Sequence, residues 1–183
     1  PRSAAKIIGQ IFAGLATAVL LLLAYQFSVS GKTAAEISLI RYGDVEILGF
    51  AIDTVSVLVA CAVVGIGFLI SIYSGGYLNA GNREHPDSVH RRYFAFLSLF
   101  IGAMAGLVFS STIIGQLVFF EISGVCSWAL IGYYEKPKSL FSAAKALIIT
   151  HIASLGLYVA ASVLFLETHT FSLAAIGGLS DGL

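Results

Sequence analysis

Residues 7–29 read IIGQIFAGLATAVLLLLAYQFSV, a run without a single charged side chain. A transmembrane helix needs roughly 20 apolar residues to cross a hydrocarbon core about 30 Å thick. Four further stretches meet or approach that length, at about residues 47–78, 93–109, 112–134 and 139–166. None alternates with the period of two typical of a membrane β-strand. The sequence therefore predicts an all-α membrane protein, with residues 1–183 forming a single membrane domain of about five transmembrane helices.

The composition agrees with a lipid-embedded chain. Of the 183 residues, 58% are hydrophobic and 11% are charged, against about 25% charged residues in soluble domains. The formal net charge is zero, which gives no basic surplus for nucleic acid. Cys61 and Cys126 lie in apolar runs outside any metal-binding spacing, so we expect no metal and no cofactor. The first run is too long for the apolar part of a signal peptide, and we interpret it as a membrane helix.

The distribution of Lys and Arg predicts the orientation, because these residues are concentrated in cytoplasmic loops. If the helices alternate in direction, seven basic residues fall on one side and two, Lys32 and Arg41, on the other. The seven are Arg2, Lys6, Arg83, Arg91, Arg92, Lys136 and Lys138. The N-terminus is therefore expected in the cytoplasm. The short link at residues 110–112 predicts an antiparallel helix pair, and Pro137 separates the fourth helix from the fifth.

Three ionisable residues lie inside predicted membrane spans, where such residues are costly and usually functional. Glu121 belongs to the fourth span, while Lys145 and His151 belong to the fifth. At about 1.5 Å of rise per residue, Glu121 and His151 both lie roughly 18–20 Å from the turn that joins their helices, and Lys145 lies roughly 9 Å from it. We therefore expect the acid and the imidazole at one depth near the membrane centre.

This combination suits the passage of protons or cations. A carboxylate in lipid needs a nearby positive charge, and the ordinary pKa of histidine lies near neutrality. Each residue also has a structural interpretation. Lys145 can extend to the interface, His151 can bond a carbonyl, Glu121 can serve packing alone, and Asp53 can cap a helix start. Gly102 and Gly106 fit close helix packing, and we interpret Ser123, Ser127 and Thr150 as packing residues.

Several stretches, in order, resemble one family of membrane subunits. FFEISGVCSWALIGYY at 119–134 is similar to its WEGVGLCSYLLIGFYY pattern, and RRYFAFLSLF at 91–100 to its RFFAYLNLF segment. Residues 50–78, the lysine-bearing stretch 143–165 and THTFSL at 168–173 also have counterparts. The family comprises the antiporter-like subunits of complex I, of Mrp sodium/proton antiporters and of energy-converting membrane-bound hydrogenases. The KALIITHIASLG form is closer to the hydrogenase and Mrp branches.

The resemblance implies a proton- or sodium-translocating subunit of a multi-subunit complex in a prokaryotic cell membrane. Other membrane subunits, the lipid bilayer and H⁺ or Na⁺ would be its partners, and electron transfer would occur elsewhere. Glu121 matches the family's functional glutamate and Lys145 a lysine in the next helix. His151 and Ser154 stand where the complex I pattern has an arginine and an aspartate, and Trp128 replaces a tyrosine.

The resemblance covers family helices two to six, so we expect a fragment or one half of a split subunit. A second interpretation is a non-transporting structural module that packs against other subunits. A third, a small independent carrier, has little support because no inverted repeat is visible.

Overall fold

The computed structural model describes residues 2–30, 34–78 and 90–177, with side chains from residue 6 onward except that of His90. Five of its helices are long and apolar enough to span a membrane, which confirms the predicted all-α membrane fold. They are α1 (Arg2–Ser30), α2 (Thr54–Tyr77), α3 (His90–Phe109), α4 (Ile113–Ile131) and α5 (Pro137–Thr168). The chain is therefore a multi-pass membrane protein.

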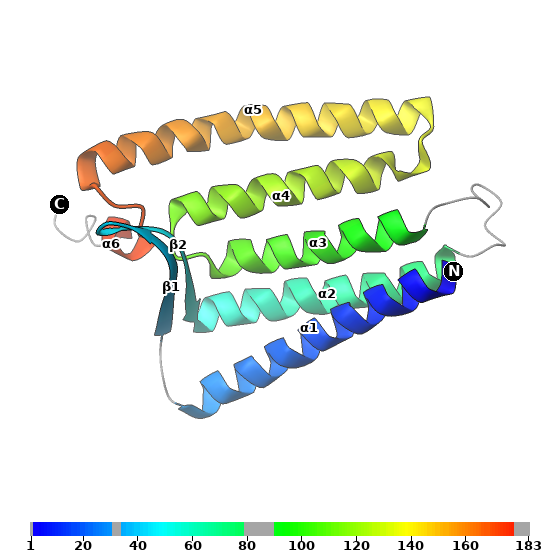
Figure 1. Ribbon diagram of the computed structural model, residues 1–183, viewed down its shortest axis with the longest axis horizontal. Coiled ribbons are helices and arrows are strands. Elements are labelled where there is room, and N and C mark those ends of the chain that lie inside the picture. The colour runs from blue at the N-terminus through cyan, green and yellow to red at the C-terminus, as the bar shows by residue number, and fades with distance from the viewer. Residues whose placement is uncertain (1, 31–33, 79–89, 178–183) are drawn as a thin grey trace.

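The helices form one row with an additional helix across it. In Figure 1, α2, α3, α4 and α5 lie side by side, while α1 runs obliquely along α2 and α3. A buried cluster joins α1, α2 and α3 and consists of Ala13, Leu20, Ala60, Val64, Leu97 and Ile101. Small residues bring the helices together: a Cβ on Gly67 would meet Ile101, and one on Gly106 would meet Phe119. Gly102, expected to act with Gly106, faces open space.

A two-stranded hairpin precedes α2, and it corrects the predicted start of the second helix at residue 47. Strands β1 (Ala34–Tyr42) and β2 (Val45–Asp53) pair antiparallel around a turn with Gly43 at φ 59°. Helix α2 begins only at Thr54, because Asp53 accepts a hydrogen bond from the Ser56 amide and Ser56 accepts one from the Asp53 amide. Asp53 thus has the structural role that its sequence position indicated.

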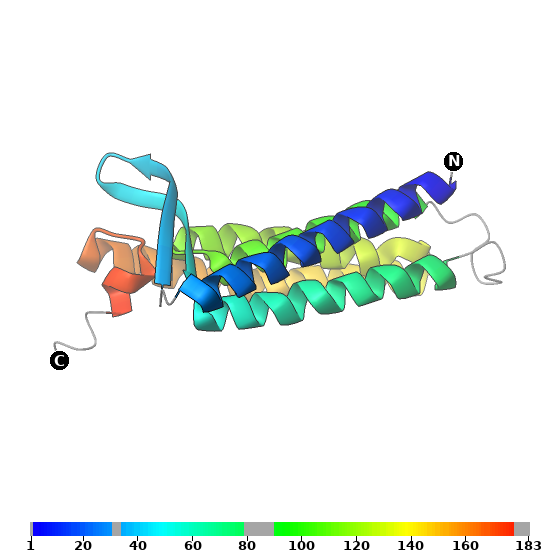
Figure 2. The ribbon, with the colours of Figure 1, turned by 90° about the horizontal axis from the view of Figure 1, so that it is seen from below.

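The hairpin stands at one end of the bundle (Figure 2), where it is hydrogen-bonded to the link between α3 and α4. The Ser111 amide donates to the Gly49 carbonyl at 2.9 Å, and the Thr112 hydroxyl donates to the Ile47 carbonyl at 2.8 Å. The Ser111 hydroxyl donates to Glu46 at 3.0 Å. These bonds fix the hairpin across the end of the bundle opposite the N-terminus.

The turn between α4 and α5 lies at the same end as the N-terminus (Figure 1). The chain makes a short 3-10 helix, η1 (Gly132–Tyr134), and passes through Glu135 at φ 54°. Helix α5 then begins at Pro137, two residues before the predicted start, because proline suits the first helical turn, where its missing N–H has no partner to lose. After α5 the chain continues into the short helix α6 (Leu173–Gly177).

Candidate functional site

The site begins with the close approach of α4 and α5. Small residues lie where these segments meet: a Cβ on Gly124 would come within 4.0 Å of the Thr150 hydroxyl, and one on Gly132 within 3.4 Å of Ala143. Two hydroxyl groups in this region form hydrogen bonds within their own helices. Ser123 donates to the Phe120 carbonyl, and Thr150 donates to carbonyls one turn back. Ser123 and Thr150 thus bond to backbone carbonyls of their own helices. Glu121 and His151 instead contact each other across the helix pair.

The acid and the imidazole, expected at one depth because both are counted from the same turn, meet in the structure. His151 Nε2 lies 2.9 Å from Oε2 of Glu121. The Glu121 side chain is 22% exposed and that of His151 is 45% exposed. The carboxylate therefore has the basic partner that an acid in a membrane span requires.

The second oxygen of the carboxylate also has a partner. The Ser154 hydroxyl donates to Oε1 of Glu121 at 2.6 Å and lies 2.9 Å from the His151 carbonyl. The Tyr158 side chain lines the recess beside Glu121. The carboxylate is thus held on both oxygens by two side chains of one helix, His151 and Ser154 of α5.

The other ring nitrogen of His151 determines where its proton sits. Nδ1 lies 3.0 Å from the Leu147 carbonyl, and a carbonyl oxygen only accepts hydrogen bonds. Nδ1 must therefore carry a hydrogen, which leaves Nε2 as the nitrogen that can gain or lose one. The contact between Nε2 and Oε2 then holds a single proton, either as imidazolium with carboxylate or as imidazole with carboxylic acid. Both forms have zero net charge, which suits a low-dielectric position.

Beside this pair lies an open recess of about 550 Å³, lined mostly by α5. Ile148, Ile152 and Leu155 form its apolar part, while Glu121, His151, Ser154 and Tyr158 form its polar part. The acid–imidazole pair therefore borders a space that another polar group or water can enter.

Comparison with known proteins shows the family to which this chain belongs. Residues 40–94 match the family described as NADH-ubiquinone oxidoreductase (complex I), chain 5 N-terminus, and residues 110–180 match NADH:quinone oxidoreductase/Mrp antiporter, TM. The chain belongs to the antiporter-like subunits of complex I and Mrp antiporters. Glu121, His151, Ser154 and Tyr158 all lie within the second matched region.

Curated relatives and a solved structure agree with this family. The chain is 32% identical over 137 residues to NAD(P)H-quinone oxidoreductase chain 5 of Synechocystis sp. and 33% identical over 130 residues to the chloroplastic subunit 5 of Chara vulgaris. These matches cover 74% and 70% of the chain and 19% of each relative. The structure of the Mrp complex from Dietzia sp. contains a chain with the same fold, at a TM-score of 0.69 and 23% identity, over 94% of this chain and 20% of that one. The chain thus spans about a fifth of the length of these antiporter-like proteins.

Lys145 lies away from the Glu121–His151 pair. Lys145 is exposed on α5, together with its neighbours Ile148 and Ile149. It lies six residues before His151, which is about 120° away around a helix and about 9 Å along it. Among the described residues, the predicted trio is therefore a contacting pair with a lysine on another face.

Ser154, which contacts Glu121, and Tyr158, which lines the recess, are residues that sequence reasoning does not assign to the site. The sequence marks Ser154 only as a difference from the family pattern. Their spacing held the signal, because positions three and seven residues after His151 share its helix face.

Proposed function

We propose that this chain is a proton-translocating part of a complex I-like or Mrp-like membrane assembly, and that the Glu121–His151 pair carries the proton. The contact between Nε2 and Oε2 at 2.9 Å supports this most directly. Membership of the antiporter-like family supports translocation as the process. A hydrogenase assembly, one of the two branches that the KALIITHIASLG form resembles more closely, stays a prediction.

The proton accounting gives the pair its mechanism. With one proton between Nε2 and Oε2 the pair is neutral, with none it carries one negative charge, and with two it carries one positive charge. A charge in low dielectric is costly. Proton entry and exit are therefore governed by other charges that approach or leave the recess.

The ligand set favours a proton over sodium. Hard metal cations prefer several oxygen ligands, whereas one carboxylate oxygen here faces an imidazole nitrogen and the other a hydroxyl donor. Each carboxylate oxygen therefore faces a group with which it can share a hydrogen. Among the described residues, the site therefore offers a proton a better position than a bare cation.

We assign Lys145 an indirect role. Its exposed position on α5 allows its charge to act on the pair only through space or through rearrangement. Replacing it with Gln should change the apparent proton affinity of the assembly without abolishing transport. Lys138→Gln, another exposed lysine of α5, provides the matched control.

We further propose that the N-terminus faces the cytoplasm of a prokaryotic cell. The basic residues whose side chains the structure describes are unevenly distributed. Arg41 belongs to the hairpin and Lys145 lies within α5, while the segments at the N-terminal end of the bundle carry Lys6, Arg91, Arg92, Lys136 and Lys138. This asymmetry supports the orientation through the positive-inside rule.

The test uses the intact complex reconstituted in liposomes, with proton uptake followed by a pH-sensitive dye. Glu121→Gln should lower coupled uptake at least tenfold with assembly unchanged, because the amide cannot exchange a proton. Glu167→Gln, the same change at an exposed position of α5, should leave uptake intact. Full pumping by the Glu121→Gln complex would reject the role and favour the structural-module interpretation. A strict requirement for sodium would reject the choice of ion.

A further inference from the structure

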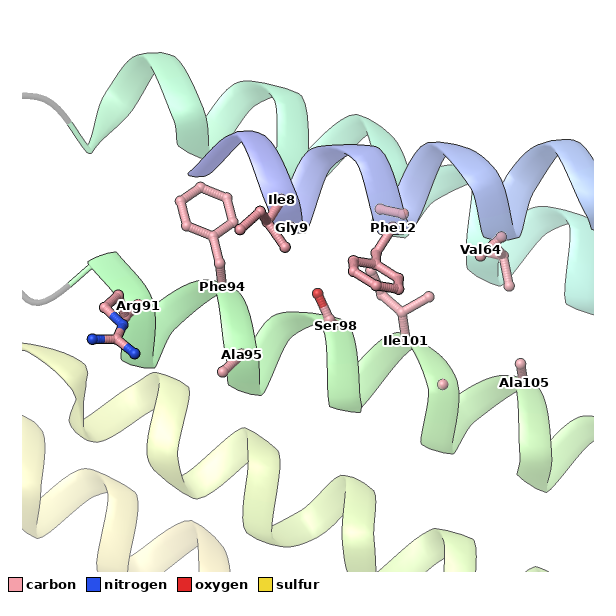
Figure 3. Close-up of a pocket in the computed structure, with 13 residues that line it drawn as sticks. Ile8, Gly9, Phe12, Val64, Arg91, Phe94, Ala95, Ser98, Ile101 and Ala105 are labelled. Atoms are coloured by element: carbon pink, nitrogen blue, oxygen red, sulfur yellow. The ribbon is translucent and has the colours of Figure 1, made fainter. Parts of the chain in front are cut away.

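A second feature of the molecule lies far from the Glu121–His151 pair, in a groove between α1 and α3. The groove has a volume of about 760 Å³, within the range of about 300–1,000 Å³ typical of ligand sites. Figure 3 shows Ile8, Gly9 and Phe12 of α1 opposite Phe94, Ser98 and Ile101 of α3. It opens on a face of the bundle that the transport proposal does not use.

The groove exists because its lining side chains are small. Gly9, Ala13, Ala16, Ala95, Gly102 and Ala105 line it together with the larger residues. A Cβ added to Gly102 would have no atom within 4 Å, whereas one added to Gly9 would touch Phe94. The two helices are thus in contact near Gly9 and leave unfilled space near Gly102.

The dimensions of the groove match one leaflet of a bilayer. From Arg91 to Ala105 the helix rises about 21 Å. A leaflet contributes about 15 Å of hydrocarbon, half of a core about 30 Å thick, followed by the headgroup layer. The groove is therefore long enough for one acyl chain with its phosphate at the level where α3 begins.

The charge among the described lining residues of the groove is positive and lies at one end. Among the lining residues that the structure describes, Arg91 at the start of α3 is the charged one, and the others are apolar except for Ser98. The neighbouring Arg92 is already ion-paired with Glu135 at 2.8 Å. Among the described residues, Arg91 is thus the cation available to a negative group at the mouth of the groove.

We propose that this groove binds an anionic phospholipid, with one acyl chain between α1 and α3 and its phosphate at Arg91. Arginine is well suited to phosphate because its planar guanidinium donates several hydrogen bonds. A zwitterionic lipid offers the same chain and a weaker net attraction. The lipid would hold α1 against α3 without contacting the translocation pair.

The experiment uses the intact complex in vesicles of phosphatidylcholine with a small fraction of a photoactivatable lipid that carries a diazirine on its acyl chain. One preparation contains phosphatidylglycerol as the probe and the other phosphatidylcholine. Peptides that cross-link are identified by mass spectrometry. We expect the phosphatidylglycerol probe to label residues 8–16 and 91–105 several-fold more than the phosphatidylcholine probe does. Unlabelled phosphatidylglycerol should reduce this labelling by competition.

Two pairs of variants separate charge from shape. Arg91→Gln should lower labelling by the anionic probe about fivefold, the factor expected from one lost arginine–lipid interaction, with Lys138→Gln unchanged. Gly102→Leu should fill the groove and lower labelling by both probes. Gly156→Leu, at a glycine of α5 that also faces open space, should change neither.

Several results would overturn the proposal. These are equal labelling of the groove by the two lipids, labelling that Gly102→Leu leaves unchanged, or cross-links from the groove to another polypeptide in place of lipid. The comparison of the two probes on the wild-type complex needs no variant, so a variant that fails to assemble leaves the test decisive.

Discussion

The Ser154 hydroxyl contacts both residues of the proposed proton site, the carboxylate of Glu121 and the backbone carbonyl of His151. Its Oγ is buried and donates to Glu121 Oε1 at 2.6 Å. A hydrogen bond to a charged group contributes about 1.5–3 kcal/mol. We expect Ser154→Ala to lower proton uptake by about tenfold or more, because the carboxylate loses its orientation toward His151.

The matched control for this prediction lies on the same helix. Ser162 is exposed and donates only to the Tyr158 carbonyl, so Ser162→Ala should leave uptake and assembly unchanged. A positioning role for Ser154 also predicts rescue by Ser154→Thr, which keeps the hydroxyl. If the alanine variant pumps at the wild-type rate, Glu121 does not depend on Ser154 for its orientation.

At the residue scale, the sequence predicted the pair and failed on its surroundings. Glu121 and His151 could be matched in depth because both are counted from one turn. Whether the two side chains face each other depends on how each helix is rotated about its axis. The spacing of residues 147, 151, 154 and 158 indicates that rotation for α5. The six-residue separation of Lys145 from His151 indicates a different face, a point that depth alone does not reveal.

The hairpin β1–β2 is the element that sequence reasoning missed. Residues 47–53 continue the apolar character of α2, so hydropathy does not distinguish a strand from a first helical turn. The helix boundary was nonetheless encoded in Asp53 and Ser56, whose reciprocal hydrogen bonds start α2. Capping residues mark the beginning of a helix where average hydrophobicity cannot.

Gly49 is a position where the hairpin has no room for a side chain. A Cβ there would be closer than van der Waals contact to the Ile37 carbonyl and to the Glu46 and Ser111 side chains. Since overpacking typically costs about 1–3 kcal/mol, Gly49→Ala should lower the thermal unfolding temperature of the purified complex and speed proteolysis within residues 34–53.

The control for the hairpin prediction is Gly65→Ala in α2, where an added Cβ meets no atom within 4 Å. This substitution should leave both measurements unchanged or raise stability slightly, since alanine favours a helix. Equal proteolysis of the two variants would contradict the idea that Gly49 secures the hairpin.

At the scale of the whole molecule, the number and order of membrane helices followed from the sequence. Apolar runs long enough to span a bilayer have few alternatives, because the backbone must satisfy its own hydrogen bonds in lipid. The sequence did not predict which groups cover the outer surface of the bundle. Helix α5 packs mainly on α4 and exposes Ile148, Ile152 and Leu155. The described residues therefore leave Lys145 and the recess exposed at the outside of the bundle.

The last prediction concerns the orientation of the molecule in the membrane. In a background with Cys61 and Cys126 replaced by Ala, single cysteines are introduced as Tyr42→Cys in the hairpin and Lys138→Cys near the start of α5. Both native side chains are exposed, Tyr42 to 83%. An impermeant maleimide should label position 42 in intact cells and position 138 only in inverted vesicles, because the basic end of the bundle is retained in the cytoplasm. The reverse pattern would place the α4–α5 turn outside the cell, so that the shortest route from the cytoplasm to the Glu121–His151 pair would begin at the hairpin end.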